Sequence, residues 1–282
     1  MNYINSIFPN IHFSFQLSPI DRSILNLLHK IIMRTNLAYN YQFNYHTQKY
    51  SLRYILASIL FVIKHATKWR ILGSSYNNIY KHYIKLNKYG IFKNTYVEML
   101  NKYLKKTNNR RLKCVYTDTT FIVNKYGIDC KKRNKYMKNK NCNKISIFVD
   151  NNNVPISFNI YSGNVNDARI LYNELDNINP IIKKNIKYLC ADKGYCSNKN
   201  RIKLLNSNIV PIIPFNKRNT KDKTKIKCLT CDEKKILRKR IYIEHLFASL
   251  KSFIKIANRY EKYIDNYRGL IYIFLIYKLY KK

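Results

Sequence analysis

Three carboxylic acids in this chain lie where their type and position could do chemistry. Asp118 and Asp192 each follow a short apolar run that is typical of a buried strand. Glu244 is a lone acid in a basic row on a predicted helix, residues 238–255. If the two strands are neighbours and this helix covers them, the three carboxylates converge. The alternative for Glu244 is a surface helix on which it pairs with Arg240, worth only about 0.2–0.5 kcal/mol.

Converging carboxylates are suited to hard metal ions. They would repel one another and shift each other's pKa values unless cations occupied the site. Mg²⁺ prefers carboxylate oxygens, keeps several waters and accepts substrate phosphate as a further ligand. Two such ions about 3.5–4 Å apart can activate an attacking oxygen and stabilise the leaving oxygen in phosphoryl transfer. These residues therefore predict a metal-dependent reaction on a phosphodiester.

The composition indicates a folded protein with a polyanionic partner. The chain has 282 residues, and its 46% hydrophobic content is enough for one large or two modest cores. Its formal net charge is +38, so nucleic acid is the first candidate partner. The abundance of Lys, Asn, Ile and Tyr is also what an AT-rich genome produces, so we use the sign of the charge rather than its size.

Cysteines and apolar runs indicate where the protein works. The seven Cys are scattered, which predicts no disulfide framework and favours a reducing compartment. Cys228 and Cys231 form a single CxxC pair, and whether they bind metal stays open. No signal peptide is recognisable, and the apolar runs at 54–63 and 270–277 are shorter than the roughly 20 residues that cross a bilayer. We expect no membrane partner and a location inside the cell with DNA.

The first part of the chain, residues 1–105, has helical periodicity. Predicted helices cover 21–28, 54–65, 76–86 and 95–104, with a turn at Gly73. Short helices carrying Lys81, Lys85 and Lys88 are compatible with a helix-turn-helix module on DNA. A plain helical bundle with a solvated basic face explains the pattern equally well.

The second part, residues 112–282, has an α/β pattern after a polar linker at 105–111. We expect a mixed five-stranded sheet flanked by helices, with functional groups at the carboxyl ends of strands. Asp167 is expected to cap a helix at 168–175, and Asp129 and Glu174 to be solvated. A basic insertion covers about 216–236. The predicted strands are 113–118, 145–149, 156–160, 186–192 and 209–213, and further helices reach 205 and cover 268–279.

At these residues the chain resembles a known family, the DDE-superfamily transposases of bacterial insertion sequences, nearest the insertion sequence five group. The family has a ribonuclease-H-like catalytic domain. For the third acid, Arg240, Glu244 and Lys251 fit its Tyr-x2-Arg-x3-Glu-x6-Lys signature, although Leu237 stands where Tyr is expected. The other similar segments are 116–120 for the first Asp, the Gly-x-x-x-Asp turn at 163–167, the Asp-x-Gly-Tyr motif at 192–195 and the Arg-Tyr-Glu segment at 258–262.

The resemblance implies a site and a reaction. Asp118 and Asp192 would hold two metal ions, which are Mg²⁺ or alternatively Mn²⁺. Glu244 would complete the binding site of the second ion. DNA binding falls to Arg240, to Lys251 and to Lys255 further along the basic row. The reaction is cleavage of double-stranded DNA at terminal inverted repeats, followed by attack of the freed 3′-hydroxyl on target DNA. The family joins two ends in one complex, which implies a homodimer.

Two other functions remain open on the sequence alone. A domesticated or inactive derivative would bind DNA without cutting it. A hydrolytic nuclease of the same fold would cut DNA without joining it. A DNA-binding derivative has no need to keep the three acids, so their presence favours an enzyme.

Overall fold

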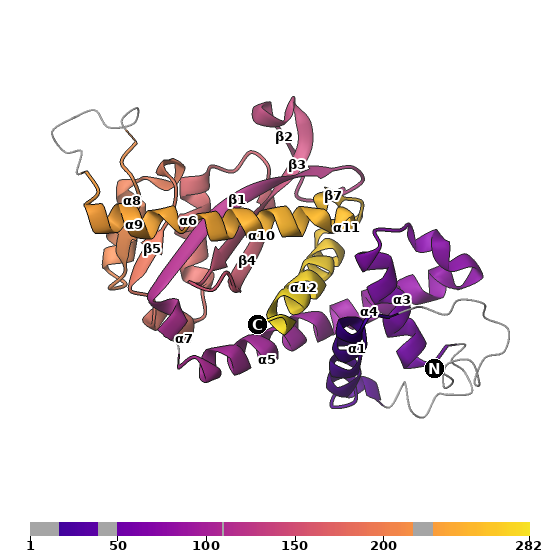
Figure 1. Ribbon diagram of the computed structural model, residues 1–282. Coiled ribbons are helices and arrows are strands. Elements are labelled where there is room, and N and C mark those ends of the chain that lie inside the picture. The colour runs from indigo at the N-terminus through magenta and orange to yellow at the C-terminus, as the bar shows by residue number, and fades with distance from the viewer. Residues whose placement is uncertain (1–16, 39–49, 109, 217–227) are drawn as a thin grey trace. The chain divides into compact units, whose positions relative to one another are not determined.

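The computed structural model describes residues 17–38, 50–108, 110–216 and 228–282. The chain forms two compact units (Figure 1). The helical unit comprises the described parts of Met1–Met99 with Phe253–Lys255 and Arg268–Lys281. The α/β unit comprises the described parts of Leu100–Ser252 with Ile256–Tyr267 and Lys282. No described helix is long and apolar enough to span a bilayer.

The helical unit is built from amphipathic and largely buried helices. Its helices are α1 (Pro19–Ile32), α3 (Leu52–Lys64), η2 (Trp69–Ser75), α4 (Tyr76–Lys88), the first part of α5 (Ile91–Lys106) and most of α12 (Ile264–Tyr280). The four helices predicted at 21–28, 54–65, 76–86 and 95–104 are all present. Gly73 breaks η2 with φ 61°, a left-handed conformation that glycine adopts without strain.

A buried acid joins the first and last helices of this unit. Asp21 is 2% exposed and forms a capping box with Ser18 at the start of α1. Its carboxylate accepts hydrogen bonds from Lys64 Nζ of α3 at 2.6 Å and from the Tyr277 hydroxyl of α12 at 2.6 Å. Burial alone would raise the pKa of Asp21, but the bonds from Lys64, Ser18 and Tyr277 hold it below the usual value.

The α/β unit contains the mixed sheet that the sequence predicts. Its main strands are β1 (Cys114–Asn124), β3 (Lys140–Val149), β4 (Pro155–Ser162), β5 (Tyr188–Cys190) and β6 (Val210–Ile212). Strand β3 pairs antiparallel with β1 and β4, whereas β5 pairs parallel with β1 and β6. The predicted mixed sheet of five main strands, flanked by helices, is confirmed. The described sheet also has two short strands that were not predicted, β2 (Lys132–Asn134) and β7 (Asn258–Arg259).

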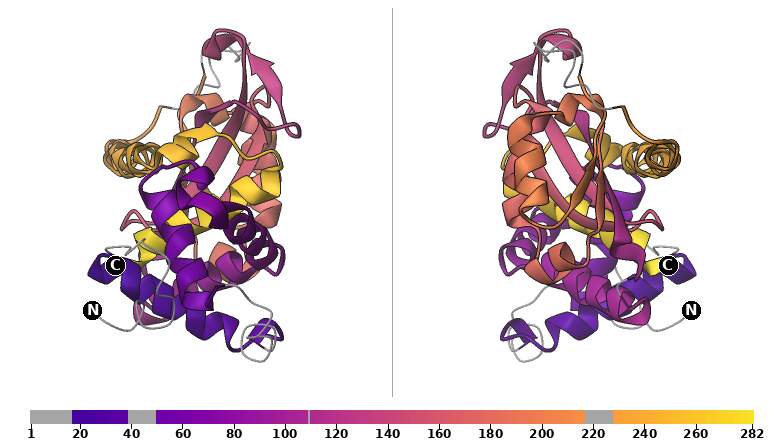
Figure 2. Two further views of the ribbon diagram at one scale, coloured as in Figure 1. Left: turned by 90° about the vertical axis from the view of Figure 1, so that its right-hand side faces the viewer. Right: turned by 90° about the vertical axis from the view of Figure 1, so that its left-hand side faces the viewer.

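Helices cover both faces of the sheet. Helix α10 (Ile241–Ser252) lies on one face, and α6 (Asp167–Asn177) and α8 (Asn198–Leu205) lie on the other (Figure 2). Ile243, Leu246 and Leu250 of α10 are fully buried, as their spacing predicts. Shorter helices are α7 (Pro180–Lys184), α9 (Cys231–Arg238) and α11 (Ile254–Ala257), with 3₁₀ turns η3 (Arg110–Lys113), η4 (Lys135–Met137) and η5 (Lys193–Tyr195).

Several boundaries differ from the expectations. The predicted first strand ends at Asp118, but β1 continues to Asn124 because it stays paired with β3 to Val123. The predicted helix 238–255 is interrupted, since α10 ends at Ser252 and α11 begins at Ile254. Helix α12 begins at Ile264 rather than at 268. Most of the basic insertion at 216–236 lies outside the described residues, and α9 occupies its end.

Some predicted roles of acids were wrong. Asp167 does not cap α6: the side chain of Asn166 accepts from the Ala168 amide, and Asp167 is the first helical residue. Asp129 pairs with the buried Arg259, and Glu174 is 1% exposed and accepts from the Tyr161 hydroxyl at 2.7 Å. The contact of Asp129 with Arg259 joins residues 130 positions apart, which local sequence patterns do not show.

Candidate active site

Strand register places Asp118 beside Asp192. Tyr116 of β1 is opposite Cys190 of the parallel strand β5. Asp118 and Asp192 each follow two residues later, so both continue on the same side of neighbouring strands, which are about 4.8 Å apart. Asp192 then caps η5, accepting from the Lys193 amide at 2.7 Å. Two of the three predicted carboxylates are therefore brought together.

Arg240 is the cation that faces both carboxylates. It directly precedes α10. This helix contacts the sheet through Tyr242, whose ring lies edge-to-face with that of Tyr116, with 6.4 Å between the ring centres. One guanidinium nitrogen of Arg240 donates to Asp118 Oδ2 at 2.7 Å, and the other lies 3.8 Å from Asp192 Oδ1. The alternative considered for this helix, a pairing of Arg240 with Glu244, is not found, since Arg240 pairs with the two aspartates.

The other predicted residues of this helix are placed differently. Glu244 is exposed in the first turn of α10, and Lys251 is exposed in its last turn. Lys255 lies in α11, is 8% exposed and has its ammonium group 5.4 Å from the centre of the Trp69 ring. Glu244 does not join the aspartates in this arrangement. In the described residues, no group of three His, Cys, Asp or Glu side chains lies close enough to hold one metal ion.

Burial and a neighbouring cation have opposite effects on the charge of Asp118. Burial raises the pKa of Asp118, while the guanidinium of Arg240 and the amide of Thr119 act in the opposite direction. Asp192 adds like-charge repulsion that also favours the neutral acid. A divalent ion at Asp118 would remove this penalty, since it stabilises the charged form.

A second polar network also contacts Asp118. Its members are Thr119, Asp167, Lys144 and Tyr195. The Thr119 hydroxyl donates to Asp167 Oδ1 at 2.9 Å, and the same oxygen accepts from Lys144 Nζ at 2.8 Å. The hydroxyl of the buried Tyr195 lies 3.4 Å from Asp118 Oδ1. This network fixes the start of α6 and the η5 turn against β1.

Sequence analysis did not assign Lys144 or Tyr195 to the site. A signal was present for two of the partners, because Asp167 ends the Gly-x-x-x-Asp turn and Tyr195 ends Asp-x-Gly-Tyr. Lys144 gave no signal in so basic a chain, although it is only 6% exposed. Close packing explains why residue 163 of the turn is a glycine, because a Cβ there would lie 2.8 Å from the backbone oxygen of Cys142.

The donor set at the two aspartates fits a hard metal ion. Both ligands are carboxylates, and no His or Cys side chain of the described residues completes a softer site. The side chain of Asp192 is 50% exposed, so water and a phosphate could reach it. Mg²⁺ often takes only one or two protein carboxylates and fills its remaining positions with water and substrate phosphate. Asp118 and Asp192 therefore suffice for one such ion.

Comparison with known families decides which family the chain belongs to. A family model described as "Transposase DDE domain" matches residues 100–279. The chain belongs to this family. The match includes both aspartates and Glu244, and it makes the protein a DDE transposase, a class of enzymes that cleave and transfer DNA with divalent metal ions. The narrower expectation of the insertion sequence five group stays a prediction.

Solved structures that resemble the chain are distant. The catalytic domain of Mos1 mariner transposase is 14% identical, with 68% of this chain and 89% of that chain covered and a TM-score of 0.29. A pre-cleavage Mos1 transpososome is 10% identical, with 94% and 96% covered and a TM-score of 0.27. The Mos1 mariner paired-end complex with Mn is 14% identical, with 68% and 60% covered and a TM-score of 0.26. A comparison with curated proteins found no match.

Proposed function

We propose that this DDE transposase cuts double-stranded DNA at terminal inverted repeats and joins the freed 3′-hydroxyl to target DNA. The observation that supports this most directly is the register-matched pair Asp118 and Asp192, faced by Arg240, inside the segment that matches the family. Carboxylates paired in this way are suited to bind the metal ions that phosphoryl transfer requires.

Each residue has a role in this proposal. Asp118 and Asp192 hold Mg²⁺, and Mn²⁺ can replace it. Glu244 is the proposed third ligand of a two-ion site, reached when α10 or the Glu244 side chain turns toward the aspartates. The bound ions would activate the attacking oxygen and stabilise the leaving one. Arg240 keeps the two carboxylates together before metal and DNA bind, and then holds a DNA phosphate.

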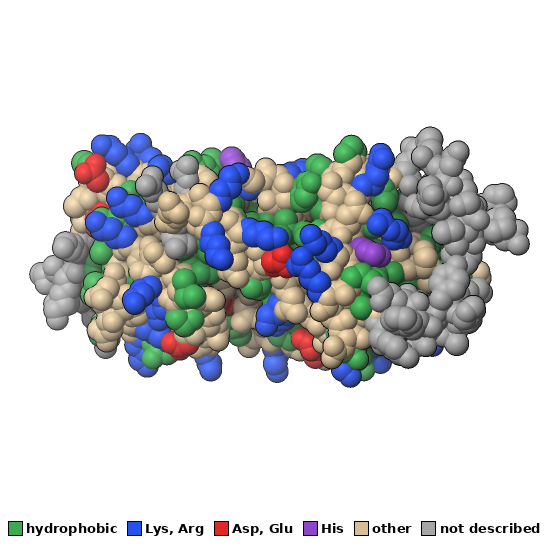
Figure 3. All heavy atoms as spheres, turned by 90° about the horizontal axis from the view of Figure 1, so that it is seen from below, with side chains coloured by type: hydrophobic (Ala, Val, Ile, Leu, Met, Phe, Trp, Pro, Cys, Tyr) green, Lys and Arg blue, Asp and Glu red, His purple; other side chains and the backbone are tan. Residues whose placement is uncertain are grey.

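DNA is the proposed partner on physical grounds. The net charge is +38, and Lys and Arg side chains are spread over the face in Figure 3, where acidic side chains are few. Lys251 is exposed and available for phosphate, whereas the burial of Lys255 argues against direct contact of that residue with DNA. The helix-turn-helix-like region at 1–105 is proposed to recognise the ends. A homodimer is proposed because joining two ends in one reaction is simplest with two copies.

The reaction is tested with a plasmid that carries the DNA flanking this gene, incubated with Mg²⁺. Joined products are expected. Nicks without joined products would favour a hydrolytic nuclease, and retarded but uncut DNA would favour the DNA-binding derivative.

The site is tested by three isosteric variants, Asp118→Asn, Asp192→Asn and Glu244→Gln. Loss of a metal ligand removes several kcal/mol of transition-state stabilisation, so cleavage should fall about a thousandfold or more. Binding of DNA, measured by gel retardation, should persist. Asp176→Asn is the matched control, because Asp176 is exposed and pairs with Lys203 instead. Cleavage retained in any of the three variants would remove that residue from the site.

A further inference from the structure

A basic hairpin projects from the sheet at a distance from the carboxylates. It is formed by β2, η4 and the first residues of β3, and it extends above the rest of the sheet in Figure 1. The ten residues 131–140 contain Lys131, Lys132, Arg133, Lys135, Lys138 and Lys140. All six are exposed, and no ion pair among the described residues includes any of them. The sequence has no acid between Asp129 and Asp150.

This basic hairpin has a defined shape. Its strands pair in register from Lys132 opposite Cys142 to Asn134 opposite Lys140. The Asn134 side chain caps η4 and donates to the Gly163 carbonyl at 2.7 Å, which ties the hairpin to the turn before α6. Lys138 and Asn139 are left-handed, with φ of 51° and 56°, and so reverse the chain. The six cations are therefore presented on a folded ribbon.

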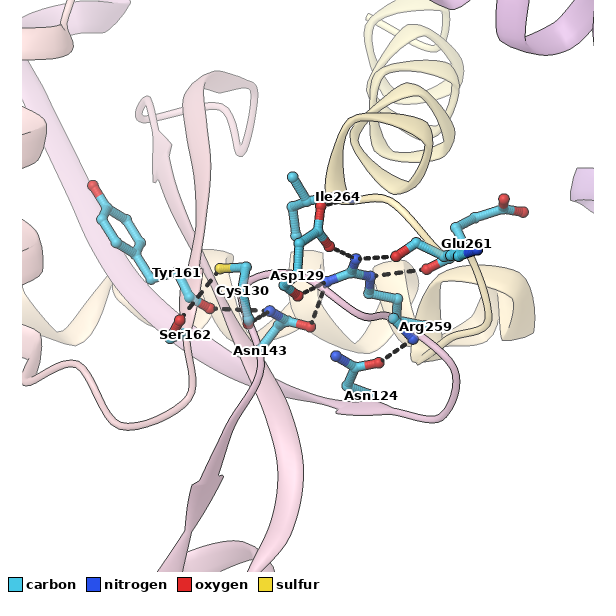
Figure 4. Close-up of polar contacts among 11 residues, drawn as sticks. Asn124, Asp129, Cys130, Asn143, Tyr161, Ser162, Arg259, Glu261 and Ile264 are labelled. Atoms are coloured by element: carbon cyan, nitrogen blue, oxygen red, sulfur yellow. Dashed lines mark hydrogen bonds and ion pairs between the residues drawn. The ribbon is translucent and has the colours of Figure 1, made fainter.

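A buried arginine fixes the base of the basic hairpin. Arg259 is fully buried and faces Asp129, Asn143 and the loop before α12 (Figure 4). Its guanidinium donates to the Asp129 carboxylate and carbonyl, to Asn143 Oδ1 and to the carbonyls of Glu261 and Lys262. Every donor of the guanidinium is thereby used. Asn143 Nδ2 donates in turn to the Cys130 carbonyl at 2.6 Å, immediately before the hairpin.

Crowded cations on a fixed ribbon are costly for the free protein. Like charges within one Debye length, about 8–10 Å, repel each other, and no described acid compensates them here. A polyanion removes that repulsion. The major groove of B-DNA is about 12 Å wide and admits a two-stranded ribbon, with phosphates along both edges. The shape and charge of the basic hairpin match this groove.

The distance to the active site also fits a DNA duplex. Ile147 is the register partner of Asp118, and Lys140 lies seven residues earlier on the same strand. At about 3.4 Å per residue this separation is at most ~24 Å along β3. A duplex rises by about 3.4 Å per base pair, so the hairpin would meet it within roughly one helical turn of the reacting phosphate.

We propose that the basic hairpin binds the phosphate backbone of duplex DNA, with its tip in the major groove, and holds the substrate of the carboxylate site. This inference rests on the proposed function of the chain as a DNA transposase. The alternative is that AT-rich codon usage filled an idle solvated surface with Lys.

The first test measures the salt dependence of DNA binding. A triple variant, Lys132→Gln, Arg133→Gln and Lys135→Gln, is compared with the full chain on a short synthetic duplex. Each lost phosphate contact should reduce the slope of log K against log salt by about 0.9, so a loss of roughly 2–3 is expected. The control triple variant, Lys184→Gln, Lys187→Gln and Lys199→Gln, also removes three exposed charges and should keep most of the slope.

The second test locates the contact. Tyr136 at the tip is 90% exposed and is replaced by a photoreactive phenylalanine, which adds no thiol to a chain with seven Cys. Irradiation with a duplex carrying the DNA that flanks this gene should give a cross-link within about one turn of the cleaved phosphate. Equal losses of slope in both triple variants, or no cross-link near the cut, would overturn the proposal. A larger loss for duplex RNA than for DNA would do the same.

The two hypotheses can fail separately. If the hairpin variant keeps the full slope while Asp118→Asn still abolishes cleavage, the proposed function stands and the hairpin contact is wrong. If neither the chain nor its variants cut any DNA, the proposed reaction fails, whereas the slope and cross-link still report on the hairpin.

Discussion

At the scale of single residues, Arg240 determines how the two aspartates are held. Its guanidinium contacts Asp118 at 2.7 Å and lies 3.8 Å from Asp192, so a metal ion must compete with an existing cation. The positive charge of Arg240 offsets part of the negative charge of the two carboxylates. Arg240 is therefore expected to set the apparent metal affinity as well as to meet DNA.

Arg240→Gln should make the protein more dependent on metal. Without the guanidinium, Asp118 and Asp192 repel each other and a divalent ion binds with no competitor. The rise in Tm on adding Mg²⁺ should be larger than in the unmodified protein, with about 1.4 kcal/mol of extra stabilisation for each tenfold gain in affinity. Arg238→Gln, an exposed arginine on α9, is the control. An identical Mg²⁺ response in both variants would contradict this role.

Asp167→Asn should cost more stability than an exposed ion pair. It leaves Lys144, whose side chain is 7% exposed, without its carboxylate. We expect a loss of about 2–3 kcal/mol in the free energy of unfolding, below the full cost for a buried pair because Asp167 is one-third exposed. Asp176→Asn breaks a pair in which the acid is 64% exposed and should cost less than about 1 kcal/mol. Hydrogen exchange of the β3 amides measures the free energy of unfolding of both variants. Equal losses in Asp167→Asn and Asp176→Asn would argue against a stabilising role of the Asp167–Lys144 pair.

At the scale of secondary-structure elements, close packing explains the glycine at position 127 but not the one at position 194. A Cβ on Gly127 would lie 2.5 Å from Arg259 Cζ and 2.7 Å from Asn124 Oδ1, where the guanidinium is already fixed by five partners. A Cβ on Gly194 would meet Asp167 Oδ2 at 3.9 Å, which is ordinary contact.

Gly127→Ala should therefore loosen the base of the basic hairpin, and Gly194→Ala should not. Overpacking of this kind typically costs about 1–3 kcal/mol. Hydrogen exchange of the amides at 128–143 should accelerate in Gly127→Ala and stay unchanged in the control. Unchanged protection in both variants would mean that Arg259 can shift without cost.

The elements were largely predictable from the sequence, but their register was not. The apolar runs at 145–149 and 156–160 predict β3 and β4, because a buried strand needs little more than such a run and a turn. The proximity of Asp118 and Asp192 depends on Tyr116 lying opposite Cys190, a pairing across more than seventy residues. The contact of Arg240 with Asp118 and the burial of Arg259 are equally nonlocal. The strand β2 was missed because its residues are charged and exposed.

At the scale of the whole molecule, we expect low pH to reduce the stability of the helical unit through its buried acid, Asp21. Hydrogen bonds overcome burial and keep the pKa of Asp21 below its usual value of about 3.9. A lowered folded-state pKa means that the stabilisation is complete above about pH 4 and is lost as the pH falls through the folded-state value.

Asp21→Asn should remove this acid sensitivity. At pH 7 the variant should lose about 1.5–3 kcal/mol, the usual contribution of hydrogen bonds to a charged group, and the difference should shrink toward pH 3. Trp69 is the single Trp and lies in the helical unit, so its fluorescence during urea unfolding reports this unit. Asp232→Asn, at an 86% exposed side chain, is the control. A difference that does not depend on pH would show that Asp21 acts through packing alone.

The bond from Tyr277 to Asp21 also sets an order for biosynthesis. Helices α1 and α3 emerge from the ribosome early, but α12, which completes their core, follows every described strand in the chain. The helical unit therefore stays unfinished until α12 has been made, whereas the carboxylate-bearing sheet is made before it. A polypeptide that ends before α12 would lack the Tyr277 partner of Asp21, so we expect its helical unit to stay poorly folded even where the sheet has formed.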